Sequence, residues 1–315
     1  MKAAYITAQH GGPEVIEYGD VEQPRVGAGE ILLKVHAIGI SPQELEWAPT
    51  WQTADGQERA KPIILGHEIS GAVVAFGAGV TAFHVGDDVY GLSSFLRNGA
   101  QAEYTIVTPA EIALKPRRSS HLEAATLPLS ALTAWQAFFE QGSLKRGQKV
   151  LIQGAAGGVG NYAVQIAHWV GAQVIAVAST RQQEFLRELG ADQLIDYTTM
   201  QFEDVVHDVD FVLDTIGGDT QQRSFTVLNK GGTLVGIASE QENRLFEWAK
   251  HYERDAKWFI VRPDTEQLAR IAELVDEGHL KPIVNSVYPL AETRQAYEHS
   301  LSGHMRGKVV IQVVE

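Results

Sequence analysis

The chain has 315 residues, of which 44% are hydrophobic and 21% charged, a composition typical of a globular enzyme with about two domains. Its formal net charge of −13 argues against binding to nucleic acid or to an anionic membrane, and no stretch approaches the ~18 apolar residues of a membrane span. The absence of cysteine excludes disulfides, thiolate nucleophiles and cysteine-based metal sites; with no signal or transit pattern at the N-terminus, it favours a cytoplasmic protein.

Residues 1–120 are predicted to form a β-rich domain. Short apolar runs are separated by Gly, Pro and Asp turns, as in a partly open barrel or a sandwich. The runs occupy residues 31–37, 69–76, 88–91, 102–107 and 111–115.

Residues 121–262 change to an alternation of strand-like and helix-like segments. Residues 122–141 are helical in character and interrupted at Pro128. The alternation predicts an α/β domain with a doubly wound parallel sheet. Its expected strands are residues 149–153, 173–178, 193–196, 209–214, 233–237 and 257–261.

Residues 263–315 are expected to return to the first domain. They offer a helix at 265–277, a short strand at 286–288, a second helix at 290–300 and a closing strand at 307–314. A nucleotide domain inserted between two parts of a β-rich domain would leave a crevice for ligands.

The most informative segment, residues 150–160, is an apolar strand that ends in a glycine cluster and leads directly into a helix-like segment. Gly157, Gly158 and Gly160 permit a tight turn and a close approach of the backbone to phosphate. The N-terminus of the following helix attracts the same anion. This arrangement predicts a dinucleotide site.

The end of the second strand of this unit indicates which dinucleotide. NAD sites usually place a carboxylate there, whereas this chain has Ser179-Thr180-Arg181 and no carboxylate before Glu184. Hydroxyls and a guanidinium suit a 2′-phosphate, so the sequence favours NADP(H) over NAD(H). The alternative is that Arg181 is only a solvated residue at a helix start.

The motifs, taken in order along nearly the whole chain, resemble the medium-chain dehydrogenase/reductase superfamily. Without cysteine, the chain looks most like the zinc-free NADPH:quinone oxidoreductase branch, which includes enone and alkenal reductases. The resemblance implies a GroES-like domain plus a Rossmann domain, small-molecule substrates and a homodimer. The motifs are GEILLKV (29–35), GISP (39–42), LGHE (65–68), GAGV (77–80), VGDDV (85–89), LPLSALTAW (127–135), AAGGVG (155–160), LGAD (189–192) and GGT (231–233).

The resemblance also implies the cofactor-binding positions. Some match the pyrophosphate turn, some the adenosine end, and the others border the cofactor or approach its nicotinamide. They are Ala155, Gly157, Gly158, Val159 and Gly160 for the turn; Ser179, Arg181 and Tyr197 for the adenosine end; and Thr133, Thr215, Ile237, Ser239, Phe259 and Val261 for the remainder.

A catalytic metal is not expected. Zinc enzymes of the superfamily place the His67-Glu68 segment at their metal, but serine stands at position 41, where a first cysteine ligand would fall. A catalytic zinc normally has three nitrogen, sulfur or carboxylate ligands from the protein. His67 and Glu68 do not reach that number.

Ser41, Trp47 and Trp51 are the candidate catalytic residues. Ser41 could donate to a substrate oxygen or the nicotinamide ribose, or simply form the turn before Pro42. The tryptophans could stack on a planar substrate, or pack in the core. No tyrosine lies between Tyr18 and Tyr90, so a tyrosine proton donor from that segment is not expected.

These features predict a zinc-independent oxidoreductase that transfers hydride from NADPH to a quinone or an α,β-unsaturated carbonyl. Such acceptors are already electrophilic, so the protein needs mainly to position them and exclude water. Two alternatives stay open: a zinc-type alcohol dehydrogenase with unusual ligands, and a non-catalytic NADPH-binding protein.

Overall fold

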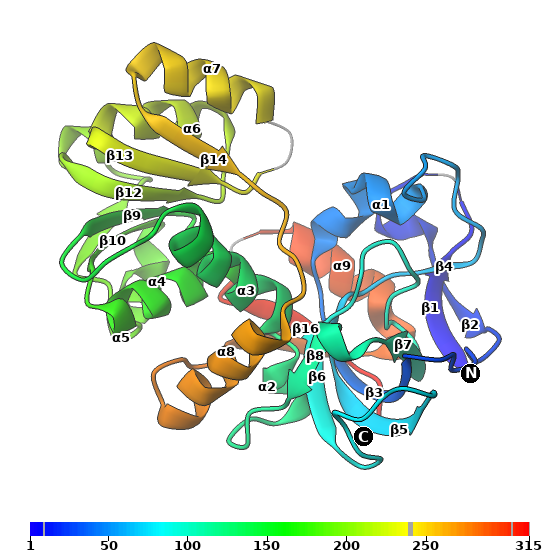
Figure 1. Ribbon diagram of the computed structural model, residues 1–315. Coiled ribbons are helices and arrows are strands. Elements are labelled where there is room, and N and C mark those ends of the chain that lie inside the picture. Colours follow the sequence, from blue (N-terminus) through cyan, green and yellow to red (C-terminus); the bar gives the residue numbers. More distant parts are fainter. Residues whose placement is uncertain (9, 239–241, 304, 315) are drawn as a thin grey trace. The chain divides into compact units, whose positions relative to one another are not determined.

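The chain folds into two compact units in the computed structural model, which describes residues 1–315 except 9, 239–241, 304 and 315 (Figure 1). Unit 1 consists of Met1–Leu132, Arg262–Gly278 and Pro282–Glu315. Unit 2 consists of Thr133–Val261 and His279–Lys281. No helix among the described residues is long and apolar enough to span a bilayer.

Unit 1 is built around a seven-stranded, mainly antiparallel sheet in the order β15-β16-β3-β5-β6-β8, with β7 also paired to β3. A second sheet has the order β2-β1-β4. The strands are β1 (Lys2–Ile6), β2 (Ile16–Asp20), β3 (Ile31–Gly39), β4 (Ile63–Ile64), β5 (Glu68–Phe76), β6 (Asp88–Leu92), β7 (Tyr104–Val107), β8 (Ile112–Leu114), β15 (Val284–Pro289) and β16 (Lys308–Gln312).

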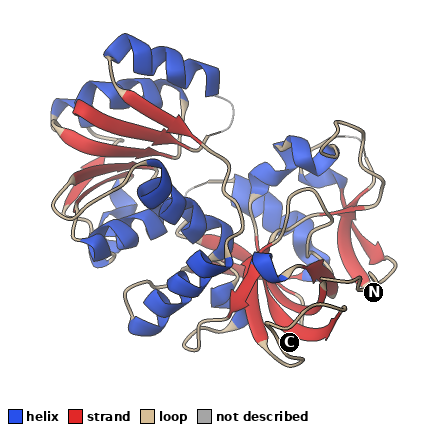
Figure 2. Ribbon diagram, in the orientation of Figure 1, coloured by secondary structure: helices blue, strands red, loops and turns tan. Residues whose placement is uncertain are grey.

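The helices of unit 1 are short, apart from two near the end of the chain. Figure 2 shows them in blue around the red strands. They are α1 (Ala48–Trp51), α2 (His121–Ala124), α8 (Thr265–Glu277), α9 (Thr293–Leu301) and the 3-10 turns η1 (Pro13–Val15), η2 (Pro42–Glu46), η3 (Pro109–Glu111) and η9 (Leu290–Glu292).

The core of unit 1 joins residues from both ends of the chain. Leu33 and Val35 of β3 pack in one cluster with Ile69 of β5, Tyr297 of α9 and Val309 of β16, all 1% exposed or less. Burial of apolar surface is worth roughly 25 cal/mol per Å². Side chains of α9 and β16, near the C-terminus, are therefore part of the β-rich core.

Unit 2 has a parallel six-stranded sheet in the order β11-β10-β9-β12-β13-β14. The order runs outward in both directions from β9, so the carboxyl ends of β9 and β12 flank the point where ligands bind in such sheets. The strands are β9 (Lys149–Gln153), β10 (Gln173–Ala178), β11 (Gln193–Asp196), β12 (Val209–Asp214), β13 (Leu228–Gly236) and β14 (Asp255–Trp258).

Helices cover both faces of this sheet: α4 and α5 lie on one face and α6 and α7 on the other (Figure 1). The helix α3 (Pro128–Gln136) runs from unit 1 into unit 2. The helices of unit 2 are α4 (Gly158–Val170), α5 (Gln183–Glu188), α6 (Gly218–Ser224), α7 (Glu242–Tyr252), the π-helical turn η4 (Ala137–Gln141) and the 3-10 turns η5 (Thr180–Gln182), η6 (Phe202–Asp204) and η7 (Phe225–Val227).

The predicted fold class is confirmed, with local differences at the ends of elements. The expected sixth strand at 257–261 is instead β14, which ends at Trp258 because its partner strand ends at Gly236. The expected helix at 122–141 is divided at Pro128, as predicted, into α2 and α3. The α7 helix had no counterpart in the sequence prediction.

Candidate functional site

The glycine turn after β9 is shaped by close backbone packing. Gly154 has φ +67°, and a Cβ built on it would lie 2.3 Å from the Thr215 hydroxyl oxygen. A Cβ on Gly160 would lie 2.3 Å from the Gly154 carbonyl oxygen. Both positions therefore need glycine so that α4 can begin directly against the turn.

Gly157 is different, because the fold does not require glycine there. Its φ is −70°, it is exposed, and a Cβ would meet only the Gly154 oxygen, at 3.3 Å. It is the N-cap of α4, so no side chain satisfies the first N–H groups of that helix. A bare, exposed backbone at a helix N-terminus fits a phosphate that approaches closely.

Asn161, which the sequence analysis did not single out, fixes this turn. Its Nδ2 donates to the carbonyl oxygens of Gly157 at 2.8 Å and Gly158 at 2.7 Å. Its side chain is buried, and its Oδ1 has no hydrogen-bond partner among the described residues. Of the other predicted turn residues, Ala155 is buried and Val159 is partly exposed.

The predicted adenosine end holds a carboxylate to which the sequence analysis gave no role. Ala178, which ends β10, pairs with Asp196, which ends β11. Asp196 accepts hydrogen bonds from the hydroxyl of Thr180 and from Thr198, whose Oγ1 lies 2.6 Å away. These bonds, with that from Thr180 the largest contribution, lower the pKa of Asp196.

The predicted residues Ser179 and Arg181 follow the end of β10, and Tyr197 follows Asp196 at the end of β11. Ser179 is half-buried, Arg181 is exposed, and the Tyr197 side chain is 57% exposed. The sequence analysis gave Asp196 no role because this residue ends the neighbouring strand β11, whereas a carboxylate was sought at the end of β10.

The turn after β12 is tied to the glycine turn. The Thr215 hydroxyl donates to the Gln153 carbonyl oxygen at 2.9 Å. Asp214 is fully buried and accepts from the N–H of Ile216 at 3.0 Å and from Gln221 Nε2 at 2.7 Å. Burial raises the pKa of the Asp214 carboxyl.

The remaining predicted cofactor positions are more scattered. Ile237 follows β13 and its N–H donates to the Asp214 carbonyl oxygen at 3.0 Å. Thr133 is buried on α3, while Phe259 and Val261 are half-buried beyond the end of β14. Ser239 lies outside the described residues.

Unit 1 contains a buried polar cluster around Ser41. The Ser41 hydroxyl donates to Glu68 Oε1 at 3.1 Å and accepts from Lys308 Nζ at 2.9 Å. Lys308 is also ion-paired with Glu68, and Glu68 Oε2 accepts from the Leu129 N–H at 3.1 Å. All three side chains in this triad are buried.

His67 belongs to an adjoining network. Its Nε2 lies 3.2 Å from Glu44 Oε1, and its Nδ1 lies 2.9 Å from the Ser93 hydroxyl. Glu44 also accepts from the Tyr297 hydroxyl at 3.3 Å, which in turn accepts from Gln101 Nε2 at 2.7 Å. Burial raises the pKa of Tyr297 far above its ordinary value.

These contacts do not fit a catalytic metal. Both ring nitrogens of His67 are engaged, and Lys308 lies against Glu68 where a ligand would need a free carboxylate. The described residues hold no group of three or more His, Cys, Asp or Glu side chains able to bind a metal ion. The sequence analysis missed Lys308 and Tyr297 because they lie far from the recognised motifs. It also gave no role to Glu44, which follows the motif at 39–42, because nothing in the sequence places that side chain beside His67.

The two candidate tryptophans contact different residues. Trp47 packs against Phe95 with ring centroids 5.1 Å apart, and Phe95 packs edge-on against His67 at 5.2 Å. Trp51 is buried, and its indole N–H donates to the Leu45 carbonyl oxygen at 2.8 Å. The pair therefore does not form one stacking surface.

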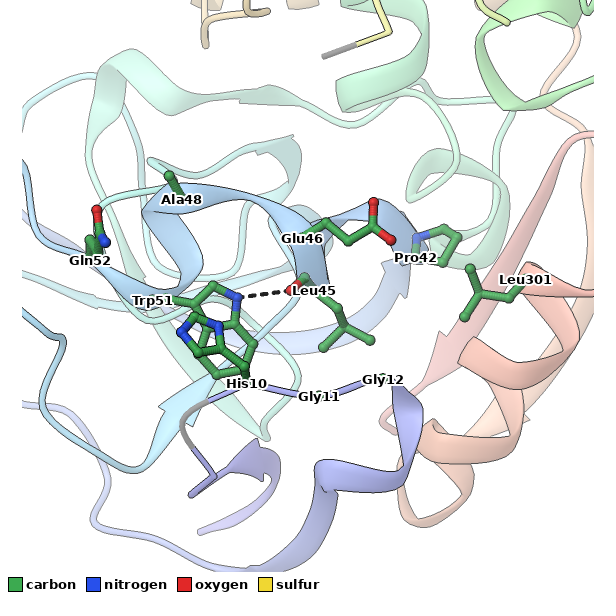
Figure 3. Close-up of a pocket in the computed structure, with 10 residues that line it drawn as sticks. All are labelled: His10, Gly11, Gly12, Pro42, Leu45, Glu46, Ala48, Trp51, Gln52 and Leu301. Carbon is green, nitrogen blue, oxygen red and sulfur yellow. Dashed lines mark hydrogen bonds between the residues drawn. The ribbon is translucent and has the colours of Figure 1, made fainter. Parts of the chain in front are cut away.

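Trp51 instead lines a separate cavity of 560 Å³ in unit 1 (Figure 3). The His10 ring lies against its indole, with centroids 4.7 Å apart. The cavity is bordered by His10, Gly11, Gly12, Pro42, Leu45, Glu46, Ala48, Trp51, Gln52 and Leu301.

Comparison with known proteins matches two stretches of the chain to families. Residues 27–117 match the alcohol dehydrogenase GroES-like domain, and residues 189–311 match a family described as zinc-binding dehydrogenase. A mouse protein named mitochondrial NAD(P)H oxidoreductase RTN4IP1 is 32% identical over 90% of this chain and 82% of its own length. An Arabidopsis thaliana chloroplast envelope quinone oxidoreductase homologue is 30% identical over 99% of this chain and 98% of its own.

Solved structures of oxidoreductases are also similar to this chain. The quinone oxidoreductase from Coxiella burnetii is similar over 100% of this chain and 99% of its own, with a TM-score of 0.93 and 34% identity. A structure described as an NAD-dependent alcohol dehydrogenase matches 100% of both chains, with a TM-score of 0.89 and 29% identity.

Proposed function

Since this chain belongs to the medium-chain dehydrogenase/reductase superfamily and is related to its quinone oxidoreductases, it is of an oxidoreductase family, and we propose that it reduces quinones or α,β-unsaturated carbonyls with NADPH, without a metal. The observation that carries the proposal is Gly157. It is an exposed glycine that the backbone does not need, at the open N-terminus of α4.

The residues at the carboxyl ends of the parallel strands suit a dinucleotide. The N–H groups at the start of α4 would hold the pyrophosphate, and Asn161 keeps the turn in shape for it. Ser179 and Arg181 would bind the 2′-phosphate, with Tyr197 near the adenosine. When bound, the reduced nicotinamide supplies a hydride.

The preference for NADP(H) over NAD(H) depends on which groups donate hydrogen bonds to the Asp196 carboxylate. A carboxylate that accepts from a ribose hydroxyl selects NAD(H). Asp196 already accepts from Thr180 and Thr198, which leaves Arg181 to set the local preference. This arrangement supports NADP(H).

The donor set in unit 1 supports an electrophilic acceptor. Alcohol oxidation needs help in removing the hydroxyl proton, and a metal often provides it. His67, Glu68 and Ser41 are committed to Glu44, Lys308 and one another instead. Quinones and enones accept hydride without that help, and need only a hydrogen-bond donor at their oxygen.

The test is the loss of NADPH absorbance with a panel of quinones, enones and alkenals, measured with and without a chelator. We expect turnover that the chelator leaves unchanged. Loss of activity under chelator, with metal found in the purified protein, would indicate a zinc-type alcohol dehydrogenase. Tight NADPH binding without turnover on any acceptor would indicate a non-catalytic protein.

A homodimer and a cytoplasmic location accompany the proposal as predictions. Light scattering on the purified protein tests the first. The relatives named above are described as mitochondrial or chloroplast proteins, so they do not support the second.

A further inference from the structure

The buried ion pair in unit 1 brings together three parts of the chain. Lys308 is the first residue of β16, Glu68 the first of β5, and Ser41 lies just after β3. The side chains of Lys308 and Glu68 are 7% and 1% exposed. We propose that the Lys308 ammonium serves as a built-in cation in place of a metal ion, polarising the Ser41 hydroxyl so that it binds the oxygen of the hydride acceptor.

The charges of the cluster show why Lys308 is needed there. Two carboxylates, Glu44 and Glu68, are buried within it. Glu44 accepts hydrogen bonds from the Gly66 N–H at 2.8 Å and from Tyr297, and His67 lies beside it. Glu68 has its ion pair with Lys308. An isolated buried carboxylate is costly, so the ammonium is needed as the counter-charge of Glu68.

The geometry directs the Ser41 proton. Lys308 donates to the Ser41 oxygen, so one lone pair of that oxygen is occupied and its own hydrogen points towards Glu68. A hydroxyl that accepts from an ammonium becomes a stronger donor, because successive hydrogen bonds polarise one another. If the Ser41 hydroxyl rotates to donate to the oxygen of the hydride acceptor, Glu68 keeps its ion pair with Lys308.

This role rests on the proposed function. The acceptor takes a hydride from C4 of the reduced nicotinamide, which is oxidised, and the acceptor oxygen gains the negative charge of an enolate or hydroquinone anion. Ser41 would donate a hydrogen bond to that anion, and water would supply the proton that completes the reduction. Pre-positioned donors of this kind stabilise developing oxyanions. Ser41 would then be the catalytic group and Lys308 a positioning residue.

The experiment compares Ser41→Ala, Lys308→Ala, Lys308→Met and Lys308→Arg. We expect kcat to fall by about 100-fold or more in the first three, the usual cost of losing an oxyanion donor, with NADPH affinity unchanged. Lys308→Arg should recover part of the loss. Propylammonium added to Lys308→Ala should restore activity, whereas Lys308→Met fills the space and should not respond. Lys230→Met, an exposed lysine of unit 2, is the control.

A double variant distinguishes the proposed role of Lys308 from a purely structural one. Glu68→Gln with Lys308→Met removes both charges, so it should recover the thermal stability that Lys308→Met loses, while kcat stays low. Recovery of kcat together with stability would overturn the inference. So would single variants with kcat within about threefold of the wild type, a loss too small for an interaction made in the transition state. If the wild type reduces no acceptor, the proposed function fails and this role with it.

Discussion

Arg181 and Asp196 carry opposite charges at the proposed adenosine end of the cofactor site. Asp196 reaches that position from β11, while Arg181 follows β10 in η5. Because two hydroxyls and a backbone N–H hold the carboxylate, it is a fixed negative charge. A 2′-phosphate at this end therefore needs the guanidinium for compensation.

Arg181→Ala should weaken NADPH binding by about 10-fold or more and leave NADH binding nearly unchanged, since a charge-assisted bond is worth about 1.5–3 kcal/mol. Fluorescence titration with both cofactors measures this. Arg187→Ala, which removes an exposed arginine on α5, is the matched control and should change neither. Equal weakening of NADPH and NADH would contradict the assignment.

Asn161 should affect both cofactors alike. Asn161→Ala removes two hydrogen bonds to the carbonyls of the turn, so the turn loses its pre-formed shape. We expect the dissociation constants of NADPH and NADH to rise together, by about 5- to 10-fold at roughly 1 kcal/mol for a net hydrogen bond. Asn229→Ala, which removes an amide that also bonds a backbone carbonyl of unit 2, should leave both constants unchanged. A cofactor-selective effect of Asn161→Ala would be inconsistent with this role.

The β9–turn–α4 element shows what a local pattern can predict. Its strand, turn and helix follow one another without a break, and each is determined by residues within a few positions. Glycine spacing and apolar periodicity therefore suffice to predict this strand, turn and helix. Asn161 was missed because an asparagine inside a helix usually has no such role.

Alanine substitutions at two glycines of this element should have different effects, one on thermal stability and the other on NADPH affinity. In Gly160→Ala the new Cβ would lie 2.3 Å from the Gly154 oxygen, so α4 must move and the protein should lose thermal stability. In Gly157→Ala the Cβ has nearly enough room at 3.3 Å, so the melting temperature should change little. Its methyl group would nevertheless occupy the phosphate position, and NADPH affinity should fall by about 10-fold or more. Calorimetry and titration on both variants test this, and unchanged affinity in Gly157→Ala would argue against a bound phosphate.

At the scale of the whole molecule, the sequence predicted the layers but not the buried cluster. Alternating strands and helices specify a parallel sheet, because that pattern repeats along the chain. The Ser41–Glu68–Lys308 triad instead depends on β16 pairing with β3, and β3 with β5, across 267 residues. No periodicity encodes which distant strands become neighbours, so Lys308 had no signal in the sequence.

Unit 1 also contains a half-buried histidine pair. His36 of β3 stacks on His121 of α2, with ring centroids 4.2 Å apart. His121 Nδ1 lies 2.8 Å from the Ser70 hydroxyl, and its Nε2 lies 3.3 Å from Asp88 Oδ1. Burial, followed by the charge of His36, lowers the pKa of His121 to about 4, against the opposing pull of Asp88. Lys115 also disfavours the charged ring.

This pair should make unit 1 sensitive to acid. The folded protein keeps His121 neutral down to about pH 4, whereas the unfolded chain protonates it near its ordinary value of about 6.5. Between these values the unfolded state binds more protons, so the free energy of unfolding falls as the pH is lowered, by up to about 3 kcal/mol. The full contribution is present above pH 6.5 and lost near pH 4.

Urea unfolding of the wild type and His121→Gln across this range measures the effect. Position 121 no longer titrates in the variant, so its free energy of unfolding should fall less between pH 6.5 and pH 4. Carboxylates that do not contact His121 act on both proteins and cancel in the difference. His84→Gln, at a side chain that is 85% exposed, should retain the wild-type dependence. Identical pH profiles for wild type and His121→Gln would show that burial of the pair does not keep His121 neutral.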